Sequence, residues 1–352
     1  MFQQRGTILV TGANGGLGSA IISQLASSPE LKAYDGIFIV KNASSATALR
    51  SALKAPRLRA VLRSHEVISL DLSRLSSVRK VAAAINTRVS SGSIPAIRAI
   101  ILNAGYEEFG KQTWTNGLDM AFTVNYLGHW LLTLQLLQSM DRDKGRIVWI
   151  SSWAQNPQDR HNVMNGAFND AKHKVMISDD LEPLAKGTWS LDEDDRTNWA
   201  AGYRRYGASK LCAVAMIHEL QRRLNQDPLL NNISVLAVDP GGMATGIARH
   251  TPWFVRVVVF LFAGILGSLL VRLFPNGTWR TPQKSARDVL AAALDNGPLP
   301  LTERPKGLYL NGSELGDYSS EAKDPNKGRV IWEGTVRYAR LKRDETILQN
   351  WQ

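Results

Sequence analysis

The stretch Thr11-Gly12-Ala13-Asn14-Gly15-Gly16-Leu17-Gly18 joins a short apolar run, Thr7–Val10, to an amphipathic run, Leu17–Ala26. This is a strand–turn–helix pattern in which glycines allow a tight turn and let the backbone approach a phosphate group. The first N–H groups of the helix add free donors and the positive end of its dipole. In this setting the turn predicts a site for the pyrophosphate of a dinucleotide.

Beyond this turn, short β-branched runs alternate with longer amphipathic runs along the chain. The alternation is typical of βαβ units and predicts an α/β fold, a Rossmann-type doubly wound parallel sheet of about seven strands with helices on both faces. The predicted strands are Thr7–Val10, Gly36–Val40, Val67–Leu70, Ala99–Leu102, Arg146–Ile150, Ile233–Val238 and Leu308–Leu310. The predicted helices are Leu17–Ala26, Ser76–Val89, Leu118–Met140, Ala208–Leu224 and Ser285–Leu294.

The composition limits the class of protein. Of 352 residues, 44% are apolar, enough to build a sizeable core, and we expect residues 1–352 to form a single domain. One cysteine, Cys212, excludes a disulfide framework, and the histidines show no metal-ligand spacing, so we expect no metal. The net charge of +11 is spread along the chain without a nucleic-acid module, so we expect no nucleic-acid partner.

The first predicted strand begins so early that no cleavable targeting segment fits before it. We therefore expect a cytoplasmic protein, with contact at the periphery of an intracellular membrane as an additional expectation. Residues 153–202 interrupt the alternation with a long polar stretch. A loop of that length without structure is uncommon in a compact domain, which predicts a folded insertion shaping a site.

A second interruption, 253–274, holds the uncharged run Val257–Val271 between Arg256 and Arg272. Its fifteen residues fall short of the roughly 20 needed to span a bilayer. Three interpretations remain open. The segment 246–280 is an apolar lid over a substrate, or it lies on a membrane surface, or, least in keeping with its length, it spans the membrane.

Tyr206-Gly207-Ala208-Ser209-Lys210 opens the fourth predicted helix. Residues four apart share one face of a helix, so the phenol and the ammonium point the same way. A neighbouring cation stabilises phenolate and lowers the tyrosine pKa, which suits proton transfer to a carbonyl oxygen. A tyrosine–lysine pair with this spacing usually lies on an exposed helix face without a catalytic role. A catalytic role for this pair therefore depends on the motifs elsewhere in the chain.

The end of the second predicted strand bears on cofactor choice. Sites that prefer NAD place an acidic residue there to bind the ribose hydroxyls, but this strand ends in Val40-Lys41-Asn42. Lys41 is placed to pair with a 2′-phosphate, which favours NADP(H). The alternative is an ordinary solvated lysine.

Five motifs occur in order along the first 245 residues: Thr11–Gly18, Asn103-Ala104-Gly105, Ser151-Ser152, Tyr206–Lys210 and Pro240–Thr245. In sequence and order they resemble the signature motifs of the short-chain dehydrogenase/reductase family. The long insertion and apolar segment look most like fungal ketoreductases and the carbonyl reductase- and retinol dehydrogenase-like members.

The resemblance implies a role for each matching position. The catalytic residues would be Ser152, Tyr206, Lys210 and Asn125. The cofactor-binding residues would be Gly12, Asn14, Gly16, Leu17, Gly18, Lys41, Asp71, Leu72, Asn103, Tyr206, Lys210, Met243 and Thr245. Among these, Asp71 would contact the adenine, Asn103 the adenine-ribose side, and Met243 and Thr245 the nicotinamide carboxamide.

The implied chemistry is a proton relay. Tyr206 protonates a carbonyl oxygen that Ser152 holds, Lys210 binds the nicotinamide ribose and lowers the tyrosine pKa, and Asn125 with a water resupplies the proton. Ser152 and Tyr206 lie farther apart in sequence than in compact members, which resembles monomeric carbonyl reductases and favours a monomer or dimer over a tetramer.

These patterns predict an NADP(H)-dependent oxidoreductase that reduces a ketone or aldehyde, or oxidises the alcohol, of a bulky lipophilic substrate, with secondary-metabolite biosynthesis as one setting. Two alternatives stay open. One is a catalytically silent protein that binds NADP(H) as a regulator or scaffold, and the other is a membrane-associated sterol- or retinol-type dehydrogenase.

Overall fold

A computed structural model describes residues 6–28, 33–54, 64–190, 198–243 and 267–352. One sheet of eight strands runs through the molecule in the order β10-β9-β8-β7-β4-β1-β2-β3. Seven of these strands pair in parallel and β10 is antiparallel, which confirms the predicted Rossmann-type sheet. The strands are β1 (Gly6–Thr11), β2 (Tyr34–Val40), β3 (Ser64–Ser69), β4 (Ile97–Leu102), β7 (Arg146–Ile150), β8 (Ser234–Asp239), β9 (Leu308–Asn311) and β10 (Glu314–Leu315).

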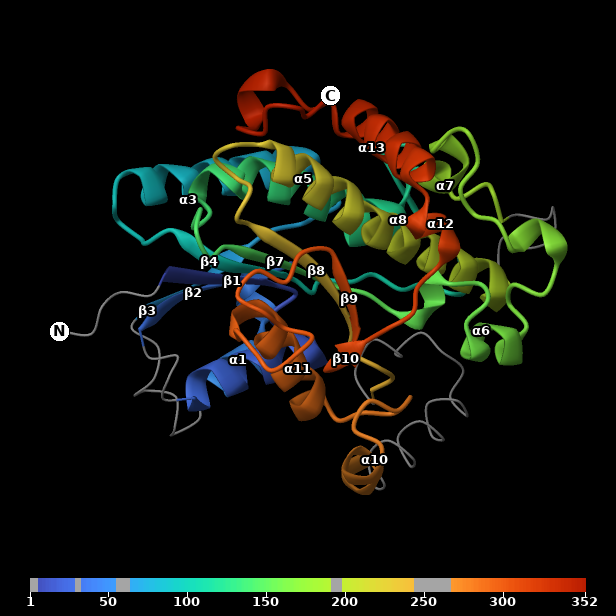
Figure 1. Ribbon diagram of the computed structural model, residues 1–352, viewed down its shortest axis with the longest axis horizontal. Coiled ribbons are helices and arrows are strands. Elements are labelled where there is room, and N and C mark those ends of the chain that lie inside the picture. The colour runs from blue at the N-terminus through green and yellow to red at the C-terminus, as the bar shows by residue number, and fades with distance from the viewer. Residues whose placement is uncertain (1–5, 29–32, 55–63, 191–197, 244–266) are drawn as a thin grey trace.

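Helices cover both faces of the sheet, as Figure 1 shows. The helices α3 (Leu75–Ser90), α5 (Gly128–Leu136) and α8 (Trp199–Gln226) lie on one face, and α1 (Gly16–Ser27) and α11 (Pro282–Leu294) lie on the other. Each layer of helices buries its own apolar cluster against the sheet. Since the central strands are buried on both faces, they read as continuous apolar runs in the sequence.

Several further described elements are short or lie near the carboxyl end. They are η2 (Ala43–Ser45), α2 (Thr47–Lys54), η5 (Leu137–Ser139), α10 (Gly267–Leu273), α12 (Ser320–Lys323), α13 (Pro325–Ala339) and η11 (Arg343–Glu345).

The prediction of one helix over Leu118–Met140 is wrong for its first residues. A small hairpin of β5 (Trp114–Thr115) and β6 (Leu118–Asp119) comes first. The Asp119 carboxylate then accepts hydrogen bonds from the N–H groups of Ala121 and Phe122. These bonds cap the first turn of α4 (Met120–Phe122). A π-helical turn, Thr123–Leu127, joins α4 to α5. Such turns within helices often mark functional sites.

The helix carrying Tyr206 also begins earlier than predicted, at Trp199 instead of Ala208. The Asn198 side chain accepts a hydrogen bond from the Ala200 N–H at 2.9 Å, which caps the helix at this point. Tyr206 therefore lies inside α8, where the helix on both sides holds its side chain in place.

The described part of the insertion contains four short helices ahead of α8. They are η6 (Trp153–Gln155), α6 (Arg160–Asn165), η7 (Ala171–His173) and α7 (Glu182–Lys186). Phe168, Met176 and Leu184 are buried in the main core. The Glu321 carboxylate before α13 also accepts the N–H groups of Met176 and Ile177, both at 2.9 Å. The described part of the insertion therefore packs against the body of the domain.

Most of the segment 253–274 lies outside the described residues. Its described end forms α10, on which Leu269 and Leu273 are exposed, and Phe274 is exposed just after it. Within the part of the chain that the structure describes, no helix is long and apolar enough to cross a membrane.

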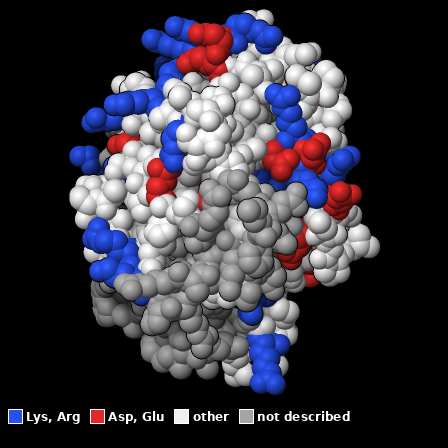
Figure 2. Space-filling model, turned by 90° about the vertical axis from the view of Figure 1, so that its left-hand side faces the viewer, with Lys and Arg blue, Asp and Glu red and all other residues white. Residues whose placement is uncertain are grey.

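Charged residues on one face of the molecule are mixed. Figure 2 shows Lys and Arg side chains dispersed over this face with Asp and Glu between them. The basic residues on this face therefore do not form one continuous basic patch.

The carboxyl-terminal segment covers the outer side of α5 and α8. Trp332 of α13 is fully buried, packs edge-on to Trp130 of α5 and lies under the Arg223 guanidinium of α8. Its indole N–H donates to the Trp351 carbonyl at 2.8 Å. One side chain therefore joins α5, α8, α13 and the last residues of the chain.

Replacing Trp332 with alanine removes this joint. We expect Trp332→Ala to lower the free energy of unfolding by about 3–5 kcal/mol, because a large fully buried aromatic side chain is lost. Urea unfolding followed by circular dichroism measures the change. Val163→Ala, which truncates an exposed side chain, is the control and should alter stability by less than about 0.5 kcal/mol. Equal stability of the two variants would contradict the structural role of Trp332.

Candidate active site

The glycine-rich turn leaves no room for side chains. Gly12 has φ of +65°, and a Cβ there would lie 2.6 Å from the Ala104 Cα. A Cβ on Gly18 would lie 2.2 Å from the Gly12 carbonyl oxygen. The helix α1 begins at Gly16, so the first N–H groups of its opening turn have no intrahelical acceptor. The turn therefore fits a pyrophosphate held by backbone N–H groups, as predicted from the sequence.

Side-chain hydrogen bonds hold the turn in place. The Asn103 amide donates to the carbonyl oxygens of Thr11 at 3.0 Å and Gly12 at 3.1 Å. The Asn14 side chain accepts the Leu49 N–H at 3.1 Å, which ties the turn to α2. Asn14 and Asn103 thus both shape the predicted cofactor site.

Lys41 and Asp71 come together beside the turn, at the ends of β2 and β3. Lys41 is 81% exposed, and its ammonium lies 4.0 Å from the Asp71 carboxylate. Burial alone would raise the pKa of Asp71, but the hydrogen bonds from Ser73, aided by the charge of Lys41, lower it. Leu72, the next predicted contact, is buried. This corner offers one cation and one anion to the adenine-ribose end of a dinucleotide.

Ser152 and Tyr206 converge at the carboxyl end of β7. Ser152 follows the strand, and its hydroxyl hydrogen-bonds the Tyr206 phenol. Ser151 is instead buried, and its hydroxyl lies beside the Tyr309 phenol and not beside Tyr206. Phe109 packs edge-on to the Tyr206 ring at 6.2 Å between centroids. The geometry therefore favours Ser152 over Ser151 as the serine of the site.

Lys210 lies one helical turn after Tyr206, and its ammonium is 5.5 Å from the centre of the phenol ring. The ammonium donates to the Ile150 carbonyl at 2.9 Å. Burial lowers the pKa of Lys210 to about 8, and the nearby Glu107 and Asp239 carboxylates partly offset this effect. Lys210 is therefore held at the floor of the site.

The predicted lowering of the Tyr206 pKa is wrong for this structure. Burial raises the pKa well above its usual value, and the carboxylate of Glu107 raises it further. The hydrogen bond from Ser152 opposes these effects but is weaker. The phenol therefore keeps its proton at neutral pH, which suits a proton donor.

The side chain of Asn125 is occupied by structural hydrogen bonds. It accepts the Tyr106 N–H at 2.6 Å and donates to the Tyr106 carbonyl at 3.0 Å and the Ser209 hydroxyl at 2.9 Å. Asn125 lies in the π-helical turn and clamps the segment after Asn103 to α8. None of these contacts is with Lys210, so its part in a proton relay stays a prediction.

Comparisons with known proteins agree with this geometry. The sequence matches the short chain dehydrogenase family over residues 6–174. It is 43% identical to the short-chain dehydrogenase iccH of Talaromyces variabilis, covering 99% of this chain and 100% of that protein. The chain belongs to the short-chain dehydrogenase family. Mouse retinol dehydrogenase 13 is 27% identical, covering 95% and 84% of the two chains.

A solved structure of the angucycline C-6 ketoreductase LanV with bound NADP has the same fold. Its TM-score is 0.54 at 18% identity, covering 88% of this chain and 96% of that one. As a short-chain dehydrogenase, the protein is an oxidoreductase acting on CH–OH or C=O groups.

The nicotinamide end of this short-chain dehydrogenase is described only in part. Met243 is half-buried after β8. Thr245, the other residue predicted to contact the carboxamide, lies outside the described residues.

Two carboxyl groups beside Tyr206 and Lys210 were not predicted. Burial raises the pKa of Glu107 to about 8, and Asp239 is buried at the end of β8 with its pKa also raised by burial. Glu107 follows the Asn-Ala-Gly motif by two positions, which is a signal that the sequence contained. The place of Asp239 depends on how the strands pack.

His129 of α5 lies between the glycine-rich turn and Asn125. Its Nε2 lies 2.9 Å from the Thr11 hydroxyl, and its Nδ1 lies 3.3 Å from the Asn125 carbonyl. Burial lowers the pKa of this histidine to about 3. The neutral ring therefore links the glycine-rich turn to the helix that carries Asn125.

The close packing of the glycine-rich turn predicts that a larger residue at Gly18 weakens cofactor binding. We expect Gly18→Ala to weaken dinucleotide binding at least tenfold, because the new Cβ pushes against the Gly12 carbonyl and deforms the turn. Titration calorimetry with NADPH measures the affinity. Gly328→Ala on α13 is the control, because its Cβ meets only an ordinary contact at 3.8 Å. Undiminished binding by Gly18→Ala would place the cofactor elsewhere.

Proposed function

We propose that the protein is an NADPH-dependent carbonyl reductase whose proton donor is Tyr206. The observation that carries the proposal is the meeting of the Ser152 hydroxyl, the Tyr206 phenol and the buried Lys210 ammonium at the carboxyl end of β7. These three groups lie beside the predicted dinucleotide-binding site, which supports catalysis of carbonyl reduction. They weigh against the alternative of a catalytically silent NADP(H)-binding protein.

The roles of the residues follow from their places. The Ser152 hydroxyl donates a hydrogen bond to the substrate carbonyl oxygen and holds it against Tyr206. The raised pKa of the phenol keeps its proton available until negative charge develops on that oxygen. Lys210 stabilises the phenolate that remains after the transfer. NADPH, when bound in the glycine-rich turn, would supply a hydride for the carbonyl carbon.

The preference for NADPH rests on Lys41. Its exposed ammonium stands at the end of β2, where a 2′-phosphate would lie, and no carboxylate ends that strand. The solved ketoreductase LanV carries NADP, in line with this choice. Asn42 and Ser44, which follow, add polar groups at the same corner.

Aromatic side chains beside Tyr206 support a bulky, largely apolar substrate. Phe109 packs edge-on to both Trp199 and Tyr203, which stack on each other at 5.1 Å between centroids. This cluster forms an apolar wall next to the phenol. An aromatic or polycyclic ketone, such as the angucycline named for LanV, fits such a wall, which supports a place in secondary metabolism.

The remaining expectations stay predictions. They are a monomer or dimer, a cytoplasmic location, and contact of 253–274 with a membrane, including the sterol- or retinol-type alternative. The helices α12 and α13 cover α8, which supports the monomer, because the covered face of α8 is closed to a second subunit.

Removal of the phenol hydroxyl tests the proton donor. We expect Tyr206→Phe to lower kcat at least 100-fold on a panel of aromatic ketones while NADPH still binds, because only the proton transfer is lost. NADPH oxidation measures the rate, and titration calorimetry measures the binding. Tyr338→Phe on α13 is the control and should keep wild-type activity.

Each result bears on a different alternative. Full activity of Tyr206→Phe would show that another group gives the proton. NADPH binding by the wild type without turnover of any ketone would favour the regulatory alternative.

The cofactor preference has its own test. We expect Lys41→Glu to lower kcat/KM for NADPH about tenfold or more and to leave that for NADH unchanged, because a charge-assisted hydrogen bond to the 2′-phosphate becomes a repulsion. Lys80→Glu on the exposed side of α3 makes the same charge change as a control. An equal effect on both cofactors would show that Lys41 does not read the phosphate.

A further inference from the structure

A polar cavity lies next to the segments that carry Ser152 and Pro240. Its volume is about 240 Å³, less than the roughly 300–1,000 Å³ of a typical pocket for a whole ligand. Trp153, which follows Ser152, and Gly241, which follows Pro240, both line it. Because it shares these segments with the site, this Trp153 cavity is suited to one part of a substrate whose carbonyl lies at Ser152.

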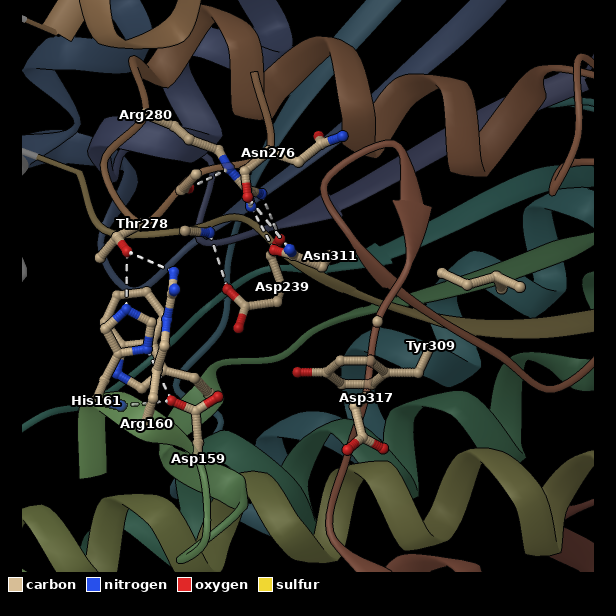
Figure 3. Close-up of a pocket in the computed structure, with 15 residues that line it drawn as sticks. Asp159, Arg160, His161, Asp239, Asn276, Thr278, Arg280, Tyr309, Asn311 and Asp317 are labelled. Atoms are coloured by element: carbon tan, nitrogen blue, oxygen red, sulfur yellow. Dashed lines mark hydrogen bonds and ion pairs between the residues drawn. The ribbon is translucent and has the colours of Figure 1, made fainter. Parts of the chain in front are cut away.

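Four parts of the chain build the cavity, one of them the end of β8 with Asp239 and Gly241. Figure 3 shows the insertion on one side, the segment before α11 above it, and β9 with the residues after β10 opposite. The residues labelled there are Asp159, Arg160, His161, Asp239, Asn276, Thr278, Arg280, Tyr309, Asn311 and Asp317.

The insertion is fastened to the opposite wall through His161. Its Nδ1 donates to an Asp159 carboxylate oxygen at 2.7 Å, and its Nε2 accepts from the Thr278 hydroxyl at 2.8 Å. The imidazole also stacks on the Trp153 indole at 4.6 Å between centroids. This contact fixes the width of the cavity and places an aromatic edge along it.

The cation deepest in the wall is not available to a ligand. Arg280 is 1% exposed, and its guanidinium donates to the carbonyls of Asp239, Asn276 and Gly277. It also donates to the Asn311 side chain. The hydrogen bonds of Arg280 hold the loop, so this guanidinium offers no free donor to a ligand.

Free acceptors remain on two carboxylates. Asp159 uses Oδ1 for His161, and Asp317 uses Oδ1 for the Tyr318 N–H and the Lys323 ammonium at 2.9 Å. Neither Oδ2 accepts a hydrogen bond from a described residue. The ion pair of Asp317 with Lys323 also limits the attraction for a second cation. Arg160 also lines the cavity, and its guanidinium donates to the Thr278 hydroxyl at 3.4 Å. The two carboxylate oxygens remain as acceptors for a group that donates hydrogen bonds.

We propose that the Trp153 cavity is a substrate subsite that binds hydroxyl groups through Asp159 and Asp317, so that the substrate is a hydroxylated aromatic or polycyclic ketone. The inference rests on the proposed reductase function and adds the polar half of the substrate. The aromatic wall takes the apolar rings on one side of Tyr206, and the cavity takes the hydroxyl-bearing ring on the other.

Matched ketones test the subsite. We compare 6-hydroxy-1-tetralone with 6-methoxy-1-tetralone, which keeps the ring and the oxygen but cannot donate. The wild-type enzyme with NADPH should favour the hydroxy ketone by about tenfold in kcat/KM. Asp159→Asn should abolish this preference, because an amide donor replaces one acceptor oxygen. Asparagine still caps a helix, so α6 is preserved.

Two further variants complete the comparison. Asp317→Asn should reduce the preference, and Asp180→Asn, which alters an ion pair with Arg337 away from the cavity, should keep it. Equal rates for both ketones in the wild type, or an unchanged preference in Asp159→Asn and Asp317→Asn, would overturn the subsite and leave the reductase function standing.

A binding measurement decides the matter if neither ketone is reduced. Resorcinol has two donating hydroxyls, and 1,3-dimethoxybenzene has the same ring without donors. By saturation-transfer NMR on the NADPH-loaded protein, resorcinol should bind the wild type at least tenfold more tightly than dimethoxybenzene, and Asp159→Asn should remove the difference. Equal binding of the two compounds, or an undiminished difference in Asp159→Asn, would overturn the subsite whatever the outcome for turnover.

Discussion

The Thr11 hydroxyl is the interaction on which the site depends. It accepts the N–H groups of Asn103 at 2.9 Å and Ala104 at 3.0 Å, and it lies 2.9 Å from His129. One buried oxygen thus joins the ends of β1 and β4 to α5. Asn125 lies in the π-helical turn directly before α5, and its side chain hydrogen-bonds Ser209 of α8. The Thr11 hydroxyl therefore helps to hold the glycine-rich turn and Tyr206 of α8 in fixed positions relative to each other.

Much of this arrangement was predictable because parallel strands end at one edge of a sheet. The glycine-rich turn, Ser152 and the Tyr206–Lys210 pair all follow from that rule once the strands are recognised. The π-helical turn was not predictable, since it depends on the capping by Asp119 and on packing against α8. The pKa of Tyr206 also escaped prediction, because burial outweighs nearby charge and burial is a property of the whole fold.

The proposed site divides into unlike halves around one phenol. Aromatic rings from α8 and from the segment after Asn103 form one half, and hydrogen-bonding groups from the insertion and the last strands form the other. The family motifs supply the chemistry shared by both halves. In the proposed site, the insertion and the carboxyl-terminal segments would supply the groups that distinguish substrates.

The packing of α13 against α5 and α8 has a consequence for how the chain folds during synthesis. The outer sides of α5 and α8 stay uncovered until residues 325–351 have left the ribosome, because Trp332 and the Trp351 carbonyl close them. The nucleotide-binding half is complete long before then. A nascent chain that lacks these residues therefore exposes apolar surface on α5 and α8, which makes it prone to aggregate until synthesis ends.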